Sequence, residues 1–258
     1  MRLVDRFRRS SYSVACVEST PIGAFFGNGA PLIPLIYSKE LSMTKDTTLS
    51  RMTNSGVVAV LRAPNGDILG DVAEALLAGG VEAIEITFTV PGAHRVLEQV
   101  ADRLGDRILL GAGTVLDTET ARVALLAGAE FVVSPVVNLD VIRLCRRYDK
   151  AVMPGALTPT EVLTAWEAGA DIVKVFPSDL TGPKYLKALH GLLPQVQLMP
   201  TGGVNLDTAA DFLRAGACAL GIGGSLVESK AVAAGDMQRI ESLARQYVDI
   251  IKKTRAER

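Results

Sequence analysis

The sequence predicts an α/β protein built as a single (β/α)8 barrel of the TIM type, preceded by an N-terminal extension. Three observations lead to this prediction: apolar runs alternate with amphipathic segments from residue 56 onward, eight such runs can be counted, and polar side chains gather where the runs end. Strict alternation of strands and helices is typical of parallel strands joined by crossover helices. Eight units in about 200 residues match one compact barrel.

The expected strands are rich in β-branched and small apolar residues. They span residues 57–63, 83–89, 108–115, 131–137, 151–157, 171–177, 196–203 and 218–225. Stretches between them, such as "GDVAEALLAGG" and "HRVLEQVADRLG", repeat leucine and alanine at helical spacing. Several helices are expected to start at Asp or Thr caps ("LDTETA", "LTPTEV", "NLDTAA") and to end in glycine. The alternative is a doubly wound open sheet, which is disfavoured because no glycine-rich dinucleotide turn follows the first run.

The beginning of the chain differs in composition from the rest. Residues 1–48 start with basic residues and continue with mixed Ser, Gly and Pro. An Arg- and Ser-rich start is compatible with a targeting peptide, but Asp5 and Glu18 interrupt it and no apolar segment with a cleavage site follows. We expect an extension that is disordered or results from an early start codon, followed by one domain at residues 49–258.

Composition and charge exclude several classes of protein. The chain is 48% hydrophobic and 21% charged, with a formal net charge of −1. This balance fits a globular protein and gives no electrostatic argument for nucleic acid or an anionic membrane as partner. The cysteines, Cys16, Cys145 and Cys218, are odd in number and form no CxxC pair. We interpret them as free thiols of a cytoplasmic protein, without a zinc site or a disulfide framework.

Polar and charged residues occupy the ends of the expected strands, where barrel enzymes place their active sites. They are Arg62, Glu85, Thr87, Thr89, Thr114, Ser134, Pro135, Pro154, Lys174, Phe176, Thr201–Gly203 and Gly223–Ser225. Because side chains alternate between the faces of a strand, Arg62, Glu85 and Lys174 should all point to the barrel axis. A buried ion cluster that only compensates its own charge would add little stability. We therefore predict that the three residues take part in catalysis or substrate binding and do not only stabilise the fold.

A buried lysine next to a carboxylate indicates covalent catalysis on a carbonyl compound. A desolvated lysine near a second cation, here Arg62, is favoured as a neutral and nucleophilic amine. A neighbouring carboxylate such as Glu85 can transfer protons. The only histidines, His94 and His190, fall in helix or loop segments without ligand-spaced partners, so we expect no metal and interpret both as ordinary surface or capping residues.

Two glycine-rich turns end the last two expected strands. Glycine lets the backbone approach a ligand closely and direct its amides at an anion. "PTGGVN" contributes Gly202 and Gly203, and "GIGGSL" contributes Gly223, Gly224 and Ser225. Barrels often bind phosphate after strands seven and eight, and we expect Ser225 to open the following short helix. Plain tight turns are the alternative. Thr114 in "GAGTV" is a candidate contact for a carboxylate or carbonyl group.

From about Gly56 onward the chain resembles the 2-keto-3-deoxy-6-phosphogluconate (KDPG) and 4-hydroxy-2-oxoglutarate (KHG) aldolase family of class I aldolases. The segments that carry the resemblance are "GVEAIEITFT", "GADIVKVFPSDLTG", "GAGTV", "SPVV", "MPGALTPTE" and "PTGGVN". The resemblance implies that Lys174 forms the Schiff base and that Glu85 is the general acid and base. It further implies that Thr114 binds the pyruvate portion, and that Arg62, Phe176 and the glycine turns belong to the pocket and the phosphate site; we add Pro135 of "SPVV" to the substrate contacts.

The resemblance also implies a reaction and an assembly. The reaction is the reversible cleavage of 2-dehydro-3-deoxy-6-phosphogluconate to pyruvate and D-glyceraldehyde 3-phosphate, as in the Entner–Doudoroff pathway, without metal or organic cofactor. Family members are usually homotrimers. Some bacterial members carry an arginine where this chain has Thr89, so the substrate carboxylate is left to Arg62 or Thr114, with Thr89 as a further substrate contact.

Other functions fit parts of the pattern. The same chemistry could act on 4-hydroxy-2-oxoglutarate, on 2-dehydro-3-deoxy-6-phosphogalactonate or on another sugar acid. An isomerase on a phosphate-binding barrel would not need Lys174 as a nucleophile. A sugar-phosphate sensor would bind without turnover, but it would have no use for both Lys174 and Glu85.

Overall fold

The structure is a computed structural model, and it describes residues 44–257. The expected extension lies outside this range except for residues 44–48. Thr44 caps helix α1 (Lys45–Ser55) by accepting a hydrogen bond from the amide of Thr47, so the ordered fold begins before the expected boundary at residue 49. None of the helices in this range is long and apolar enough to cross a membrane.

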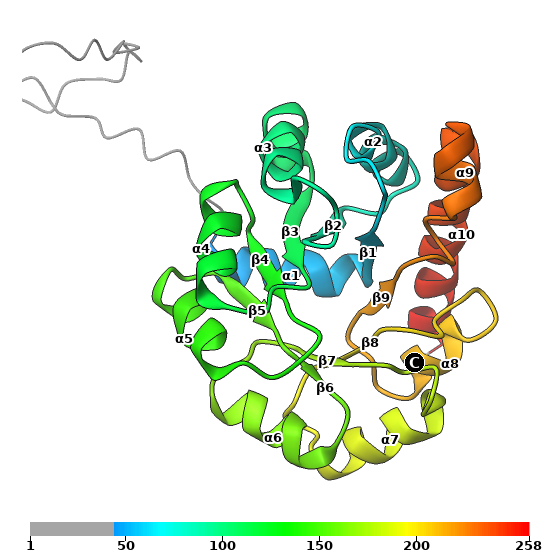
Figure 1. Ribbon diagram of the computed structural model, residues 1–258. Coiled ribbons are helices and arrows are strands. Elements are labelled where there is room, and N and C mark those ends of the chain that lie inside the picture. The colour runs from blue at the N-terminus through cyan, green and yellow to red at the C-terminus, as the bar shows by residue number, and fades with distance from the viewer. Residues whose placement is uncertain (1–43, 258) are drawn as a thin grey trace, which may run out of the picture. The chain divides into compact units, whose positions relative to one another are not determined.

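The strands form a mixed α/β fold around a curled parallel sheet (Figure 1). One part contains β1 (Val57–Leu61), β2 (Ala83–Thr87), β3 (Leu109–Gly113), β4 (Phe131–Val133), β5 (Ala151–Met153) and β9 (Leu220–Ile222), in the order β5-β4-β3-β2-β1-β9. The other contains β6 (Gly155–Ala156), β7 (Val173–Val175) and β8 (Leu198–Pro200), in the order β6-β7-β8. All pairs of neighbouring strands are parallel.

The two parts of the sheet meet at both ends. Pro154 alone separates β5 from β6, and its carbonyl accepts the amide of Lys174 at 2.9 Å. The expected strand 151–157 is therefore divided at a residue that has no N–H to donate to a sheet. At the other end, Thr201 directly follows β8 and forms an isolated parallel bridge with Gly221 of β9.

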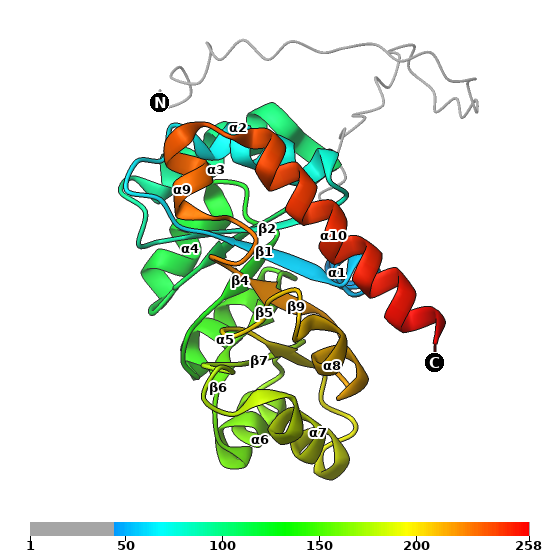
Figure 2. The ribbon, with the colours of Figure 1, turned by 90° about the vertical axis from the view of Figure 1, so that its right-hand side faces the viewer.

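Helices cover the outer side of the strands (Figure 1). They are α2 (Leu69–Ala78), α3 (Ala93–Leu104), the 3-10 turn η1 (Gly105–Arg107), α4 (Thr118–Leu126), α5 (Leu139–Arg147), α6 (Pro159–Glu167), α7 (Gly182–Leu192), α8 (Ala209–Arg214), α9 (Ser229–Ala234) and α10 (Met237–Ala256). The last and longest, α10, runs across α2 and α8 (Figure 2).

The expected caps are present where their side chains can reach the first turn. Asp117 accepts the amide of Thr120 at the start of α4, and Thr158 forms a capping box with Glu161 at the start of α6. Thr208 precedes α8 but makes no cap bond there. Its hydroxyl instead donates to the carbonyl of Gly203 at 2.9 Å, which ties the loop after β8 to the helix.

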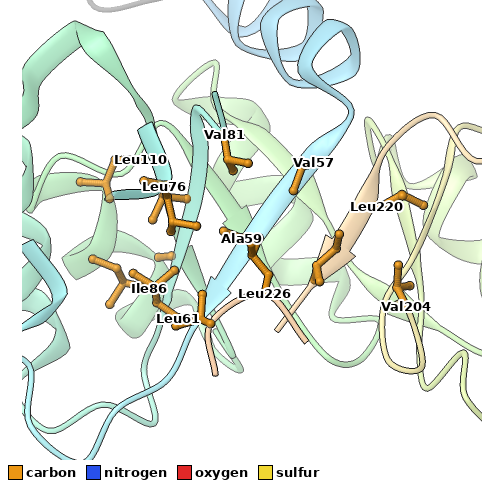
Figure 3. Close-up of a cluster of buried hydrophobic side chains, with 14 of the residues drawn as sticks. Val57, Ala59, Leu61, Leu76, Val81, Ile86, Leu110, Val204, Leu220 and Leu226 are labelled. Atoms are coloured by element: carbon orange, nitrogen blue, oxygen red, sulfur yellow. The ribbon is translucent and has the colours of Figure 1, made fainter. Parts of the chain in front are cut away.

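Side chains on the two faces of the strands form two separate apolar clusters. Val57, Ala59 and Leu61 of β1 point outward and pack with helix residues such as Leu76, as Figure 3 shows. Val58, between them, belongs to the inner cluster with residues of β2, β3, β4, β5 and β8 and with the residues that directly precede β7 and β9. Met52 of α1 is fully buried in that inner cluster, so α1 packs against the interior formed by the strands.

Candidate active site

Glu85 and Lys174 lie on the inner face of the sheet. Residues two apart in a strand share a face. Glu85 therefore lies on the same face as Ala83, and Lys174 on the same face as Ile172. Ala83 and Ile172 both belong to the inner cluster. The two charged side chains are almost completely buried, with 1% and 3% of their surface exposed. Their shared faces with Ala83 and Ile172 agree with the expectation that both side chains point inward.

The carboxylate of Glu85 is buried without a hydrogen-bond partner. Neither of its oxygens is bonded to any group in residues 44–257. Burial raises the pKa of Glu85, and the positive charges of Lys174 and Arg62 oppose this rise without cancelling it. With its pKa raised, the carboxyl group holds a proton more readily than a free glutamate does, so it can act both as an acid and as a base.

Gly113 makes room for this carboxylate. The strands β2 and β3 pair Thr87 with Gly113, and the Glu85 side chain extends along β2 toward that glycine. A Cβ atom at position 113 would lie 1.8 Å from Oε1 of Glu85, which no pair of atoms can tolerate. The glycine at position 113 of "GAGTV" is thus required by the side chain of Glu85, which occupies the space where a Cβ atom would be.

The ammonium group of Lys174 contacts an aromatic ring. Its Nζ lies 5.1 Å from the centroid of Phe176, the second residue after it on the same face. No ion pair or hydrogen bond holds Nζ within the described part of the chain. The amine is therefore available to a carbonyl carbon that enters from the cavity next to Phe176.

That cavity has a volume of about 350 Å³ and opens at the carboxyl ends of β1, β7, β8 and β9. Its lining residues are Val60, Arg62, Phe176, Thr201, Gly202, Gly203, Val204, Gly221, Gly223, Gly224, Ser225, Val227 and Ser229. Arg62 is exposed at the rim and not buried beside Glu85, because it follows the end of β1. The three charges therefore do not form one buried cluster: two are inside, and the third is at the entrance.

Seven of the predicted site residues line this cavity, and five do not. Glu85 and Lys174 are buried on the inner face of the sheet, with Lys174 against the lining residue Phe176, whereas Thr89, Thr114 and Pro135 belong to loops after β2, β3 and β4. Thr201, which the sequence placed at the end of a strand, also lines the cavity, and its hydroxyl is buried without a partner in residues 44–257. Sequence reasoning did not identify Val60, Val204, Gly221, Val227 and Ser229 as lining residues.

The glycine turns present unused amides to the cavity. Gly202 and Gly203 have φ angles of +88° and +70°, and a Cβ at Gly203 would come within 2.7 Å of Asp179. Among the turn and loop bonds of residues 44–257, none is donated by the amides of Gly203, Gly224 or Ser225. Such amides form a site for an anion. Ser225 does not open the next helix as expected: it lies in a turn, and α9 begins at Ser229.

The threonines after β2 and β3 are held in distinct ways. The hydroxyl of Thr87 donates to the carbonyl of Leu61 at 3.1 Å and lies 2.7 Å from the hydroxyl of Thr89. Since Thr87 has one proton, Thr89 donates to it and keeps its lone pairs free. Thr114 has a φ of +57°, which is strained for a β-branched residue and typical of a functional site.

Pro135 and the histidines complete the list of predicted residues. Pro135 is half-buried, and a Cβ at Gly155 would lie 2.4 Å from its carbonyl carbon, so the loop after β4 approaches β6 closely. His190 is half-buried against Gly216 and His94 is half-buried in α3. Nowhere in residues 44–257 do three or more His, Cys, Asp or Glu side chains form a group that could hold a metal ion.

Comparisons with known proteins agree on one family. Residues 49–243 match the family described as KDPG and KHG aldolase. The 2-dehydro-3-deoxy-6-phosphogalactonate aldolase of Escherichia coli is 34% identical over 204 residues, which cover 79% of this chain and 96% of that protein. The 2-dehydro-3-deoxy-phosphogluconate aldolase of Haemophilus influenzae is 32% identical, covering 82% of this chain and 100% of that protein.

A solved structure extends the comparison to chemistry. The KDPG aldolase of Legionella pneumophila was captured with pyruvate as a covalent carbinolamine intermediate. It superposes with a TM-score of 0.72 at 27% identity, covering 79% of this chain and 97% of that chain.

Proposed function

This chain belongs to the KDPG and KHG aldolase family, and from that premise we propose that it is a class I aldolase of phosphorylated 2-keto-3-deoxy sugar acids. The reaction is the reversible cleavage of 2-dehydro-3-deoxy-6-phosphogluconate to pyruvate and D-glyceraldehyde 3-phosphate. The observation that carries the proposal is the buried pair of Lys174 and Glu85, next to a cavity walled by unused backbone amides.

Lys174 and Glu85 divide the chemistry between them. The Nζ of Lys174 attacks the C2 ketone, and loss of water from the carbinolamine gives an iminium. Glu85 takes the proton of the C4 hydroxyl while the C3–C4 bond breaks, so that the bonding electrons enter the iminium and form an enamine. Glyceraldehyde 3-phosphate leaves, C3 receives a proton from Glu85, and water hydrolyses the pyruvyl iminium to restore Lys174.

The remaining residues bind the two ends of the substrate. The amides of Gly203, Gly224 and Ser225 fit a phosphate group, which favours a phosphorylated substrate. Arg62 at the rim and Thr114 after β3 are the candidates for the carboxylate, and Thr89 is an acceptor for a substrate hydroxyl. Pro135 and Phe176 bound the pyruvate portion from either side.

We further infer the closed form of the sheet and the assembly. Counting β5 and β6 as one interrupted strand, the junctions at Pro154 and at Thr201–Gly221 support a barrel of eight strands. The expected domain of residues 49–258 is extended at its start to Thr44, because α1 packs against its interior. We also infer a homotrimer, and exposed apolar side chains in the loops after β3 and β4 support a contact between subunits.

A second substrate is favoured by the comparisons. The relative from Escherichia coli carries the name of a phosphogalactonate aldolase, which differs in the configuration at C4. The same cavity fits either epimer, because the phosphate and the carboxylate are unchanged. The preferred substrate can be identified by measuring the rate of cleavage of each epimer and of 4-hydroxy-2-oxoglutarate, which carries no phosphate.

Borohydride reduction in the presence of pyruvate tests the covalent step. We expect a reduced pyruvyl adduct on the peptide that contains Lys174, detected by mass spectrometry. Lys174→Ala should lose both adduct and cleavage, whereas Lys187→Ala, which removes an exposed lysine of α7, should keep both. An adduct at another lysine, or cleavage by folded Lys174→Ala, would refute the assignment.

A further inference from the structure

One wall of the cavity is held from behind by the C-terminal helix. Tyr247 of α10 is fully buried, and its hydroxyl donates to the carbonyl of Ser225 at 3.4 Å. Ser225 lies in the turn after β9 and lines the cavity. The contact joins two segments that are 22 positions apart in the sequence. Figure 2 shows α10 lying across the side of the molecule that faces the viewer, close to α8 and α9.

The contact fixes the orientation of one peptide plane. The amide of Leu226 donates to the carbonyl of Gly223 at 2.9 Å, and the carbonyl of Ser225 accepts from Tyr247. Both polar groups of the peptide unit between Ser225 and Leu226 are therefore bonded, in opposite directions, and the unit is planar. The turn cannot rotate this unit without breaking one of the two bonds.

The amides that remain are those an anion needs. Gly224 and Ser225 line the cavity, and within residues 44–257 their amides donate to no backbone group. A glycine-rich turn without a fixed peptide plane would sample several orientations, because glycine has little preference for the sign of φ. Binding an anion would then cost the entropy of ordering the turn.

We propose that Tyr247 is a positioning residue that holds the turn Gly223–Ser225 in the orientation that binds the phosphate group of the substrate. It does not touch the substrate itself. The proposal rests on the proposed function, because it deepens the assignment of this turn to phosphate.

The phenol remains a donor under all working conditions. Burial raises the pKa of Tyr247 to about 12; a hydrogen bond with the Ser225 side chain opposes this rise, and the negative charges of Asp207 and Glu228 add to it. Glu228 is itself paired with Arg239 at 2.8 Å. The hydroxyl is thus protonated at neutral pH and donates to the carbonyl of Ser225.

The variant Tyr247→Phe removes the hydroxyl and keeps the buried ring. We expect its KM for 2-dehydro-3-deoxy-6-phosphogluconate to rise about threefold to tenfold, the scale of one hydrogen bond, with kcat unchanged. The KM for 4-hydroxy-2-oxoglutarate, which has no phosphate, should not change. Calorimetric titration with inorganic phosphate should give a dissociation constant raised by the same factor.

Tyr185→Phe is the matched control. Tyr185 of α7 also donates its hydroxyl to a backbone carbonyl, that of Leu157, but does not line the cavity. It should leave KM for both substrates as in the wild type. An equal rise of KM on both substrates in Tyr247→Phe, or an unchanged affinity for inorganic phosphate, would overturn the proposal and reduce Tyr247 to a core residue.

A measurement on the unmodified chain keeps the two proposals apart. Inorganic phosphate should shift the backbone amide resonances of Gly224 and Ser225, and shifts confined to other residues would overturn the role of this turn. Trapping of pyruvate on Lys174 requires no phosphate. A chain that forms the adduct but shows no shift therefore retains the aldolase function and loses only this inference.

Discussion

Glu85 is placed where a charged carboxylate is least stable. It is buried and has no hydrogen-bond partner in residues 44–257, and the positive charges of Lys174 and Arg62 compensate only in part. Its folded pKa is therefore raised above the value of about 4.3 that an unfolded glutamate has. The folded state then holds the proton more tightly than the unfolded state, and stability falls as pH rises from the unfolded to the folded pKa.

Glu85→Gln should therefore separate stability from activity. A neutral amide of the same shape removes the cost of burying the charge, so we expect the free energy of unfolding at neutral pH to rise by about 1–3 kcal/mol. The gain should vanish below pH 4, where the wild-type carboxyl is protonated in both states. Cleavage should slow by about 10²–10⁴-fold because proton transfer is lost. Urea unfolding at several pH values and initial rates measure the two effects.

Glu82→Gln is the control for this prediction. Glu82 stands before the same strand, but it is half-exposed and pairs with Arg51 at 2.9 Å. Its replacement should leave the rate unchanged and should not stabilise the protein. A Glu85→Gln variant that is less stable than the wild type at neutral pH would mean that the attraction to Lys174 outweighs burial.

At the level of elements, α1 plays a larger part than its sequence suggests. The segment "KDTTLSRMTNS" is mostly polar, and only Thr48 and Met52 are buried. Met52 nevertheless packs with Val58, Phe131 and other residues of the inner cluster. At the first residue of α1, Lys45 forms an ion pair with Asp171 at 3.0 Å. The second carboxylate oxygen of Asp171 accepts a hydrogen bond from the amide of Val152.

Met52→Ala should destabilise the protein without changing catalysis. Removing a fully buried methionine leaves a cavity inside the strands, which costs about 2–5 kcal/mol. The cleft at the carboxyl ends of the strands does not include α1, so kcat and KM should stay close to the wild type in chains that remain folded. The midpoint of thermal unfolding measures the loss. Met237→Ala, at a half-buried position of α10, should lower it less.

Some features of the strands and helices could be predicted from the sequence, and others could not. A period of two along residues 83–89 is enough to put Glu85 inside, because one face of that strand is otherwise apolar. The break at Pro154 follows from its missing N–H. In contrast, α1 could not be recognised, since the surface that buries Met52 is assembled from strands far along the chain. The exposure of Arg62 and the place of Ser225 depend on how each strand ends, which side-chain pattern does not encode.

Over the whole domain, the residues proposed for catalysis and those that stabilise the fold lie in different parts of the sheet. The cavity with its glycine amides opens at the carboxyl ends, and the inner cluster with Met52 fills the interior behind it. The C-terminal helix contributes to both parts: α10 packs on α2 and α8, and it also contacts the turn at Ser225, which lines the cavity. A curled parallel sheet allows this separation, since the loops at the carboxyl ends of its strands can change while the packed interior stays fixed.

The inferred homotrimer is the prediction that concerns the whole molecule. Leu116, Val136 and Leu139 are 51%, 49% and 37% exposed, and the side-chain amide of Asn138 donates to the carbonyl of Leu116 at 2.9 Å, which brings their loops together. These apolar side chains, two in adjoining loops and Leu139 at the start of α5, offer a surface that a neighbouring subunit can cover, and a cyclic trimer closes through such contacts. We expect sedimentation equilibrium to give three times the 27.3 kDa of one chain.

Val136→Asp should lower this mass, because a charge would be buried in the contact. Leu192→Asp, at an exposed position of α7, should leave the mass unchanged. A wild-type mass of one chain would exclude the trimer, and a trimer unaffected by Val136→Asp would move the contact to another face.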